Sequence, residues 1–269
     1  MEIAGVRLSY LEAGAGPLLI FGHGTFGGKA LFRTQIESLS SRYRCVAFDW
    51  PGHGESAYDP NGWTVQSLVD AVPEFIHALG ESSAALAGVS QGGAIFMRTA
   101  LAHPDVVSAL VIMCAGPGRP SSDALASLRT FAGTLQSEGS EALRREAARS
   151  FLSHTFHAPG FANAHPAAAA QELDLVLSHH RAAMPLVVQI PAGYESIASR
   201  LTEIACPTLV LWGAHDPRLN VASEIAEAIP NAVLRVFPDA GHHLNLDAPD
   251  ATSAAIGEFL DRLPLTSSV

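Results

Sequence analysis

Short hydrophobic runs alternate along the chain with longer segments of helical periodicity. The runs LLIF, CVAF, ALVIM and TLVLW contain no alternating polar positions, which is typical of strands buried on both faces of a sheet. Strands are therefore expected at Ile3–Leu11, Pro17–Phe21, Arg44–Phe48, Ala84–Val89, Val106–Met113, Pro207–Trp212 and Val233–Phe237. Helices are expected at Ala30–Ser40, Val65–Leu79, Gln91–His103, Ala222–Ala228 and Asp250–Leu263. This alternation predicts an α/β fold with a mostly parallel sheet and helices on both of its faces.

The alternation stops between about Gly118 and Ser199, where helical segments rich in Ala, Arg and Glu occur without a convincing strand. A stretch of about 80 residues is too long for a loop without structure of its own. We expect a helical cap of residues 118–199, inserted into one core domain formed by residues 1–117 and 200–269. A separate helical domain is the alternative.

The composition excludes several classes of protein. Of the 269 residues 48% are hydrophobic and 16% charged, so the chain is not a disordered tail protein. The net charge of −10 gives no basic surface for nucleic acid or for an anionic membrane. Three scattered cysteines in apolar contexts (Cys45, Cys114 and Cys206) indicate neither a disulfide framework nor a zinc site.

We expect no targeting segment in the sequence either. Its first residues do not form a basic segment followed by a long apolar stretch, so we expect no signal peptide. No apolar run approaches the ~18 residues of a membrane span. We therefore expect a cytoplasmic protein that needs no metal or cofactor, and that is a monomer or a homodimer.

Two glycine-rich turns resemble nucleotide-binding motifs. The segment Gly22–Gly27 matches GxGxxG between a strand and a helix, and Asp49 ends the next strand, as the acid that binds ribose would. Against a dinucleotide site, Asp49 opens the turn DWPGHG, whose Pro and Gly shape the backbone. The segment Gly27-Gly28-Lys29 lacks both the first glycine and the Ser/Thr of a phosphate loop, so that possibility fails.

A third motif, Gly88-Val89-Ser90-Gln91-Gly92, lies directly between an expected strand and an expected helix. A tight strand–turn–helix connection projects the Ser90 hydroxyl above the sheet, and the flanking glycines permit the close packing that this requires. The backbone N–H of Gln91, at the start of the helix, would then point at a developing oxyanion. The alternative is a serine that only caps the helix.

A nucleophilic serine needs a base, and the base needs a carboxylate to orient it. Asp216 follows the strand Pro207–Trp212, at the edge where open α/β sheets place their sites. Asp239 and Asp247 are the rival acids. We expect Asp247 to act instead at the start of the last helix, where a negative charge is favourable.

The loop after the last expected strand offers two adjacent histidines. We favour His242 as the base because Gly241 permits a close approach, and we expect His243 to face the following helix or solvent. His215, next to the acid, is expected to be solvated.

The second oxyanion donor should come from the loop after the strand Pro17–Phe21. We assign the N–H of Thr25, with that of Phe26 as the fallback. His23 and His53 are expected to be structural, with hydrogen bonds under the glycine turns.

The motifs HGTFGG, FDWPGHGES, GVSQGG, LVLWGAHDP and AGHHLNLDAP, in this order and spacing, resemble the α/β-hydrolase fold across nearly the whole chain. The resemblance implies Ser90 as nucleophile, Asp216 as acid and His242 as base, in agreement with the assignment made from the residues. It also implies an eight-stranded sheet with a cap between the sixth and seventh strands. The segments FHAPGFANAHP and HHLNLDAP are similar to those of 3-oxoadipate enol-lactonases, although Gln91 stands where those enzymes usually carry Met.

The leading hypothesis is a serine hydrolase that cleaves a small-to-medium carboxylic ester or lactone through an acyl-enzyme. Ser90 argues against dehalogenase-like and epoxide-hydrolase-like members, which use Asp there. Carbon–carbon bond hydrolases often carry Trp just after the base, whereas His243-Leu244 follows His242 here, which argues against that branch. Those hydrolases, acyl transfer, cofactor-free perhydrolysis, lyase activity and a catalytically silent binding protein are the alternatives.

The substrate pocket is expected between cap and sheet. Its expected lining, for which core packing is the alternative, is Phe26, Phe131, Phe151, Phe156, Phe161, Met184 and Leu186. The cap also holds five histidines without an i,i+4 pair, for which we expect a scatter over the surface rather than a metal site: His154, His157, His165, His179 and His180.

Overall fold

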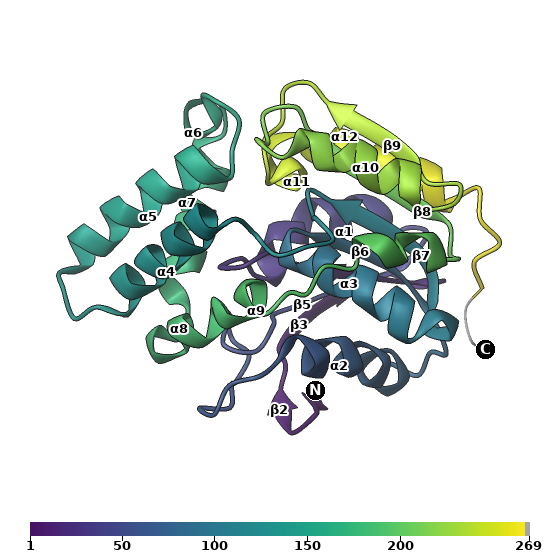
Figure 1. Ribbon diagram of the computed structural model, residues 1–269, viewed down its shortest axis with the longest axis horizontal. Coiled ribbons are helices and arrows are strands. Elements are labelled where there is room, and N and C mark those ends of the chain that lie inside the picture. Colours follow the sequence, from purple (N-terminus) through teal and green to yellow (C-terminus); the bar gives the residue numbers. More distant parts are fainter. Residues whose placement is uncertain (267–269) are drawn as a thin grey trace.

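The computed structural model describes residues 1–266, which form a seven-stranded main sheet in the order β3-β5-β4-β6-β7-β8-β9 (Figure 1). Its strands are β3 (Tyr10–Ala13), β4 (Leu18–Gly22), β5 (Arg44–Phe48), β6 (Ala84–Val89), β7 (Val107–Met113), β8 (Thr208–Gly213) and β9 (Val233–Phe237). Strand β3 runs antiparallel to β5, and every other neighbouring pair is parallel. Strands β4, β6 and β8 are buried at every position, which explains their uninterrupted hydrophobic runs.

The N-terminal segment differs from the expectation of one strand over Ile3–Leu11. Ala4 and Gly5 take positive φ angles of 48° and 74°, so the chain turns back on itself there. As a result β1 (Glu2–Ile3) and β2 (Val6–Arg7) form a separate two-stranded antiparallel sheet. The main sheet within residues 1–266 therefore has seven strands rather than the eight implied by the resemblance.

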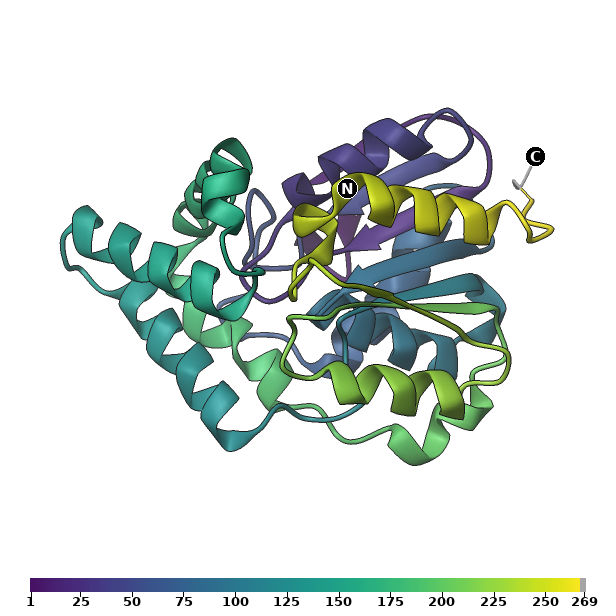
Figure 2. The same ribbon diagram turned by 90° about the horizontal axis from the view of Figure 1, so that it is seen from above.

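Helices cover both faces of the main sheet. On one face α1 (Arg33–Leu39) packs against α12 (Pro249–Leu260), and α2 (Val65–Ala78), α3 (Gln91–Ala102) and α10 (Leu219–Ala228) lie on the other (Figures 1 and 2). All five expected helices are present, with ends shifted by a few residues. Short helical segments complete the core: η1 (Lys29–Phe32), η2 (Pro104–Val106), η4 (Ala198–Glu203) and α11 (Leu244–Asp247). Within residues 1–266, no helix combines the length and apolar character needed to cross a bilayer.

The segment between β7 and β8 is helical, as expected, and lies beside the sheet (Figure 2). We call residues 118–199 the insertion. Its helices are α4 (Ser122–Gln136), α5 (Glu141–Thr155), α6 (Phe161–Ala164), α7 (Pro166–Ser178), η3 (Arg181–Ala183), α8 (Met184–Val187) and α9 (Gln189–Ala192). Most of its buried apolar side chains form a second hydrophobic cluster that also takes in Phe26, from the turn after β4. The division into a core domain and a cap domain stays a prediction.

Candidate active site

Ser90 occupies the turn between β6 and α3. Its φ of 53° and ψ of −115° lie outside the regions that most residues prefer, a strain typical of functional turns. Its side chain does not cap α3, so the helix-capping alternative is wrong. Among residues 1–266, Ser90 Oγ makes no hydrogen bond, so its hydroxyl is available to react with a substrate.

Two glycines allow this turn to form. A Cβ on Gly92 would lie 2.0 Å from the carbonyl oxygen of Gly22, at the end of β4. A Cβ on Gly88 would lie 2.3 Å from the carbonyl carbon of Gly92. Any side chain at either position would therefore separate α3 from the sheet, which explains the glycines on both sides of Ser90.

Asp216 and His242 lie together at the carboxyl edge of the sheet. Asp216 follows β8 and His242 follows β9, and Nδ1 of His242 is 2.6 Å from Oδ2 of Asp216. The two residues are only 3% and 6% exposed. Because a carboxylate only accepts, the short contact places the imidazole proton on Nδ1 and leaves Nε2 to receive a proton.

Arg218 also contacts this pair, although it was not expected from the sequence. Its Nη2 lies 3.0 Å from His242 Nδ1, 3.5 Å from Asp216 Oδ2 and 2.9 Å from the carbonyl oxygen of Cys114, to which it donates. Since Nδ1 already donates to Asp216, the guanidinium acts on His242 as a nearby positive charge. The signal in the sequence was a cation two residues after the expected acid.

Burial and charge set the protonation states of the pair. Burial lowers the pKa of His242 and the Arg218 cation lowers it further; the hydrogen bond to Asp216 raises it in part, leaving it at about 4. Burial alone would raise the pKa of Asp216, but the hydrogen bond from His242 and the charge of Arg218 hold it well below its usual range. Near neutral pH this is a neutral imidazole beside an ionised carboxylate, as a general base and its orienting acid require.

Cys114 connects this pair to the Ser90 turn. The amide of Ser90 donates to the carbonyl oxygen of Met113 at 2.9 Å, and Cys114 comes next in the chain. Cys114 Sγ donates to the carbonyl oxygen of Gly241, beside His242, over 3.7 Å. The structure thus brings the three loops that carry Ser90, Asp216 and His242 to one place on the sheet edge, although within residues 1–266 Ser90 Oγ and His242 Nε2 are not hydrogen-bonded to each other.

The turn after β4 lies directly against Ser90. A Cβ on Gly24 would be 3.0 Å from the Cβ of Ser90. Among residues 1–266, the amides of Thr25 and Gln91 have no protein acceptor, so both remain available to an oxyanion. The fallback donor is occupied, because the amide of Phe26 donates to Nε2 of His53 at 3.3 Å.

The side chains of Thr25 and Gln91 are paired with each other. Thr25 Oγ1 donates to Gln91 Oε1 at 3.1 Å, and both residues are buried. The Gln91 Nε2 group is buried without a partner in the described part of the chain. The residue after Ser90 therefore carries a buried amide group without a hydrogen-bond partner, at the position where the enol-lactonase pattern has an apolar Met.

The glycine turns serve this site rather than a dinucleotide. The buried Asp49 carboxylate accepts from the amide of Lys29 at 2.7 Å and from its Nζ at 2.6 Å, so it is not available to a ribose. His23 accepts from the amide of Trp50 at 3.0 Å, and His53 accepts from Phe26. The dinucleotide alternative is thus wrong, and the structural role expected for both histidines is confirmed.

The comparisons with known proteins agree with this architecture. A family model described as the alpha/beta hydrolase fold matches residues 17–249. The chain belongs to this family. Among its relatives, haloalkane dehalogenase 2 of Mycobacterium tuberculosis is 28% identical over 94% of this chain and 91% of the relative. The pimeloyl-(acyl-carrier protein) methyl ester esterase of Chromobacterium violaceum is 29% identical over 92% of this chain and 96% of the relative.

Solved structures of other α/β hydrolases superpose closely on this one. A thermophilic esterase from Thermogutta terrifontis has a TM-score of 0.84 at 24% identity, covering 96% of this chain and 94% of that one. The enol-lactonase from Burkholderia xenovorans LB400 has the same TM-score of 0.84 at 21% identity, covering 96% and 98%. These two likenesses show the fold of this α/β hydrolase.

Three expectations about other loop residues need correction. Asp247 does not cap the last helix of this α/β hydrolase; its carboxylate accepts from Gly241 and from His157 of the insertion. His243 does not face solvent, because it is 1% exposed and bonds to Glu172 of α7. Among the cap histidines, His157 and His179 are buried, whereas the other three are exposed.

Asp239 and His215 are exposed, as expected of residues outside the site.

The residues expected to line the pocket are mostly packed together. Phe26, Phe131, Phe156 and Met184 are buried in the second hydrophobic cluster, with Phe151 partly buried against it. Phe161 stacks on His157 at 3.7 Å between ring centroids, and Leu186 lies beside Gly62. The lining of the substrate pocket therefore stays a prediction.

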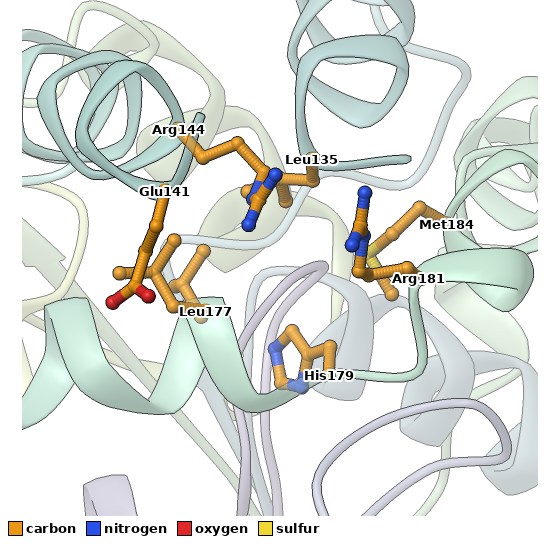
Figure 3. Close-up of a pocket in the computed structure, with 8 residues that line it drawn as sticks. Leu135, Glu141, Arg144, Leu177, His179, Arg181 and Met184 are labelled. Atoms are coloured by element: carbon orange, nitrogen blue, oxygen red, sulfur yellow. The ribbon is translucent and has the colours of Figure 1, made fainter. Parts of the chain in front are cut away.

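One cavity of about 240 Å³ lies inside the insertion (Figure 3). Arg144 and Arg181 point into it from opposite sides, and His179 lies at its base. Met184 is the one expected pocket residue that lines it. None of the lining residues is Ser90, Asp216 or His242, so we do not assign the substrate to this cavity.

Two groups of described side chains have donor atoms close enough to share a metal ion. One consists of Cys114, Asp216 and His242, and the other of His157, Glu172 and His243. In the first group the close atoms of Asp216 and His242 already bond to each other. These atoms are therefore engaged with each other rather than free to bind an ion.

Proposed function

We propose that this α/β hydrolase cleaves a small-to-medium carboxylic ester or lactone through an acyl-enzyme on Ser90. The observation that carries the proposal is the 2.6 Å contact of Asp216 Oδ2 with His242 Nδ1, on the sheet edge that also holds the strained Ser90 turn. A carboxylate, a neutral imidazole and an unengaged hydroxyl on adjacent loops are the parts that acyl transfer to serine needs.

The reaction begins when Ser90 Oγ attacks the carbonyl carbon and His242 Nε2 takes the hydroxyl proton. The carbonyl oxygen becomes an oxyanion, which the amides of Thr25 and Gln91 stabilise. The imidazolium of His242 is held by the Asp216 carboxylate, and then gives its proton to the departing alcohol oxygen. In a lactone this alcohol stays attached to the acyl group.

Water completes the cycle. His242 removes a proton from water, the hydroxide attacks the acyl carbon, and the second oxyanion collapses. Ser90 leaves with the proton from His242, and the carboxylic acid is released. The loss of one oxyanion donor typically costs on the order of 10²–10³-fold in kcat, so Thr25 and Gln91 account for a large share of the expected rate.

Ser90 limits which of the relatives' activities this chain is expected to share. Dehalogenase-like members use an aspartate nucleophile, so likeness to a dehalogenase does not carry that activity to this chain. The methyl ester esterase among the relatives and the enol-lactonase and esterase among the solved structures support ester or lactone chemistry. Which ester or lactone is the substrate depends on the pocket beneath the insertion.

The proposal is tested with a panel of p-nitrophenyl esters of increasing acyl length and a panel of lactones. Wild type should turn over at least one class, and Ser90→Ala and His242→Ala should lose that turnover. His215→Ala, an exposed histidine beside the acid, is the matched control and should retain it. A fluorophosphonate should add to wild type at Ser90, as detected by intact mass and peptide mapping.

Three outcomes would contradict the proposal. Turnover that persists in Ser90→Ala would remove Ser90 as the nucleophile. A wild type that takes up no fluorophosphonate and hydrolyses no substrate would favour a silent binding protein. Transfer of the acyl group to an added alcohol or to peroxide in preference to water would favour an acyltransferase or a perhydrolase.

A further inference from the structure

Four buried side chains form one hydrogen-bonded network between the insertion and the core, and the proposed mechanism does not use it. His157, between α5 and α6, places Nε2 2.6 Å from Oε2 of Glu172 and Nδ1 2.6 Å from Oδ1 of Asp247. The other Glu172 oxygen is 2.6 Å from Nδ1 of His243. Each of these four side chains is about 2% exposed.

At the centre of the network, the ring of His157 lies between two carboxylates, those of Glu172 and Asp247. Both ring nitrogens of His157 face carboxylate oxygens, which only accept, so both carry protons and the ring is an imidazolium. Burial alone would lower the pKa of His157, but Asp247 and Glu172 together raise it to about 9. The groups that face the ring are Glu172 from α7, Asp247 from α11 and His243 from the loop after β9; Phe161 covers one face of the ring.

The same atoms do not favour a metal ion. A histidine binds a metal through a ring nitrogen that carries no proton, and a metal at His157 would displace one of its two short bonds to a carboxylate. His243 Nε2, buried without a partner in the described residues, is on the side of the ring away from its bond to Glu172. Zinc loading would therefore break the network, and the experiments on the network include it.

The network holds the backbone on both sides of His242. Asp247 Oδ2 accepts from the amide of Gly241 at 2.5 Å and from that of Ala158 at 2.9 Å. The amide of His243 donates to the carbonyl oxygen of Phe156 at 2.7 Å. The residues before and after His242 are thus tied directly or through Asp247 to the insertion segment Phe156–Ala158.

Packing makes the same connection independently of hydrogen bonds. A Cβ on Gly241 would lie 2.6 Å from the amide nitrogen of Ala158 and 2.6 Å from the carbonyl carbon of His157, so the two backbones are in contact. The ring of Phe156 stacks on His242 at 5.3 Å and on His243 at 4.3 Å between centroids. The insertion therefore forms one wall around His242.

We infer that the His157–Glu172–Asp247–His243 network is a positioning device that fixes the loop carrying His242 against the insertion. The inference rests on the proposed role of His242 as the base. None of the four residues has a catalytic role in it: they act through the backbone of Gly241 and His243. A shift of the imidazole by about 1 Å would misalign its proton transfer with Ser90, which can cost on the order of 10²-fold in rate.

The test replaces His157 with Gln, which keeps a donor and an acceptor but removes the cation. We expect His157→Gln to lower kcat about 10- to 100-fold with KM changed less than about twofold, because the loop and not the substrate contact is altered. The matched control is His154→Gln, an exposed histidine on α5, which should keep both constants. Equal kcat and KM in His157→Gln and wild type would overturn the inference.

The pH profile separates positioning from general stability. A histidine whose folded pKa is raised holds its cation below that pKa and loses it above. Wild-type kcat should therefore fall as pH rises through about 9, whereas the lower kcat of His157→Gln should show no such step. A step of the same size in both proteins would contradict the inference.

A second readout does not depend on turnover. The Nδ1–H proton of His242, bonded to Asp216, should give a slowly exchanging NMR signal in wild type and in His154→Gln at pH 7 and a rapidly exchanging one in His157→Gln. If His157→Gln fails to fold, the wild type alone decides: as pH passes about 9, exchange should accelerate more steeply than hydroxide catalysis alone accounts for. An acceleration no steeper than hydroxide catalysis gives would refute the positioning role.

The same experiments separate this inference from the proposed function. A wild type without turnover and without a fluorophosphonate adduct on Ser90 would refute the proposed function, and the imidazole signal would still show whether the network fixes His242. Zn²⁺ added to chelator-treated wild type should leave the signal and kcat unchanged. Stoichiometric zinc binding that His157→Gln abolishes would replace the network with a metal site.

Discussion

Thr25 Oγ1 donates a hydrogen bond of 3.1 Å to Oε1 of Gln91, and this bond ties the turn after β4 to the first residue of α3. The backbone amides of the same two residues are the expected oxyanion donors. A bond between side chains thus fixes the spacing of two main-chain donors.

Replacing Thr25 with Val removes this bond without a large change in volume. It leaves Gln91 Oε1 unpaired beside the Nε2 group that already lacks a partner, and a buried unsatisfied polar group costs about 1–3 kcal/mol. Urea unfolding should show a loss of this size, and kcat should fall because the Thr25 amide is less firmly held. Thr25→Ser keeps the hydroxyl and should lie close to wild type; equal losses in the two variants would contradict the role of the bond.

The contact between Gly92 and Gly22 predicts the effect of one added methyl group. The Cβ of Gly92→Ala would meet a backbone carbonyl oxygen at 2.0 Å, so α3 must move away from the sheet. We expect a loss of about 3 kcal/mol or more in the free energy of unfolding. Gly133→Ala in α4 is the control, because nothing lies within 4 Å of its Cβ; it should gain up to about 1 kcal/mol.

The choice of acid is tested by two isosteric changes. Asp216→Asn should lower kcat on the order of 10³–10⁴-fold, since the amide no longer holds His242 in the tautomer that accepts a proton at Nε2. Asp239→Asn alters an exposed side chain two positions after β9 and should leave kcat unchanged. Steady-state kinetics on the best ester decides, and the reverse pattern would move the acid to Asp239.

Arg218 should help to determine the pH below which kcat/KM declines. Protonated His242 cannot accept the Ser90 proton, so kcat/KM should decline only as pH falls towards about 4. Arg218→Gln removes a cation that disfavours the imidazolium of His242, so the acid limb of the kcat/KM pH profile should move to higher pH. Arg218→Lys keeps a positive charge and should move it less. A limb near 6.5 in wild type, or no movement in Arg218→Gln, would show that the guanidinium has no such effect.

Buried neutral histidines should make the fold sensitive to acid. Burial lowers the pKa of His23 from 6.5 to about 3, so between these values the unfolded chain binds a proton that the folded chain does not. The free energy of unfolding should therefore fall as pH drops from 6.5. His23→Asn should flatten this slope, and the exposed His215→Asn should keep it. Urea titrations at several pH values measure the slopes; equal slopes in all three proteins would contradict the assignment.

Local patterns were enough to predict much of the fold and the places of Ser90, Asp216 and His242. Hydrophobic runs located the parallel strands, and each site residue lies in the loop or turn that follows one of them. Parallel strands end at the same edge, so these loops had to meet. The N-terminal strand was predicted too long because Ala4 carries a positive φ that its residue type does not announce.

The network around His157 could not be predicted in this way. His157 bonds to residues 15 and 90 positions away, and His243 bonds to one 71 positions away. Such pairings depend on how the insertion folds back over the core, and no periodicity encodes that. The role of the apolar cap residues stays a prediction for a related reason: hydrophobic side chains that pack together and those that line a pocket have the same pattern.

The contact of Gly241 with the His157–Ala158 backbone bears on how this fold can diversify. If the insertion were an independent module, a chimera carrying the equivalent segment of a relative would keep its chemistry and change its substrate. Here the transplanted segment would also replace one wall of the His242 loop. On the inferred role of the network, a successful exchange must carry His157, Glu172, His243 and Asp247 as a set, and a change of substrate would then be coupled to the positioning of His242.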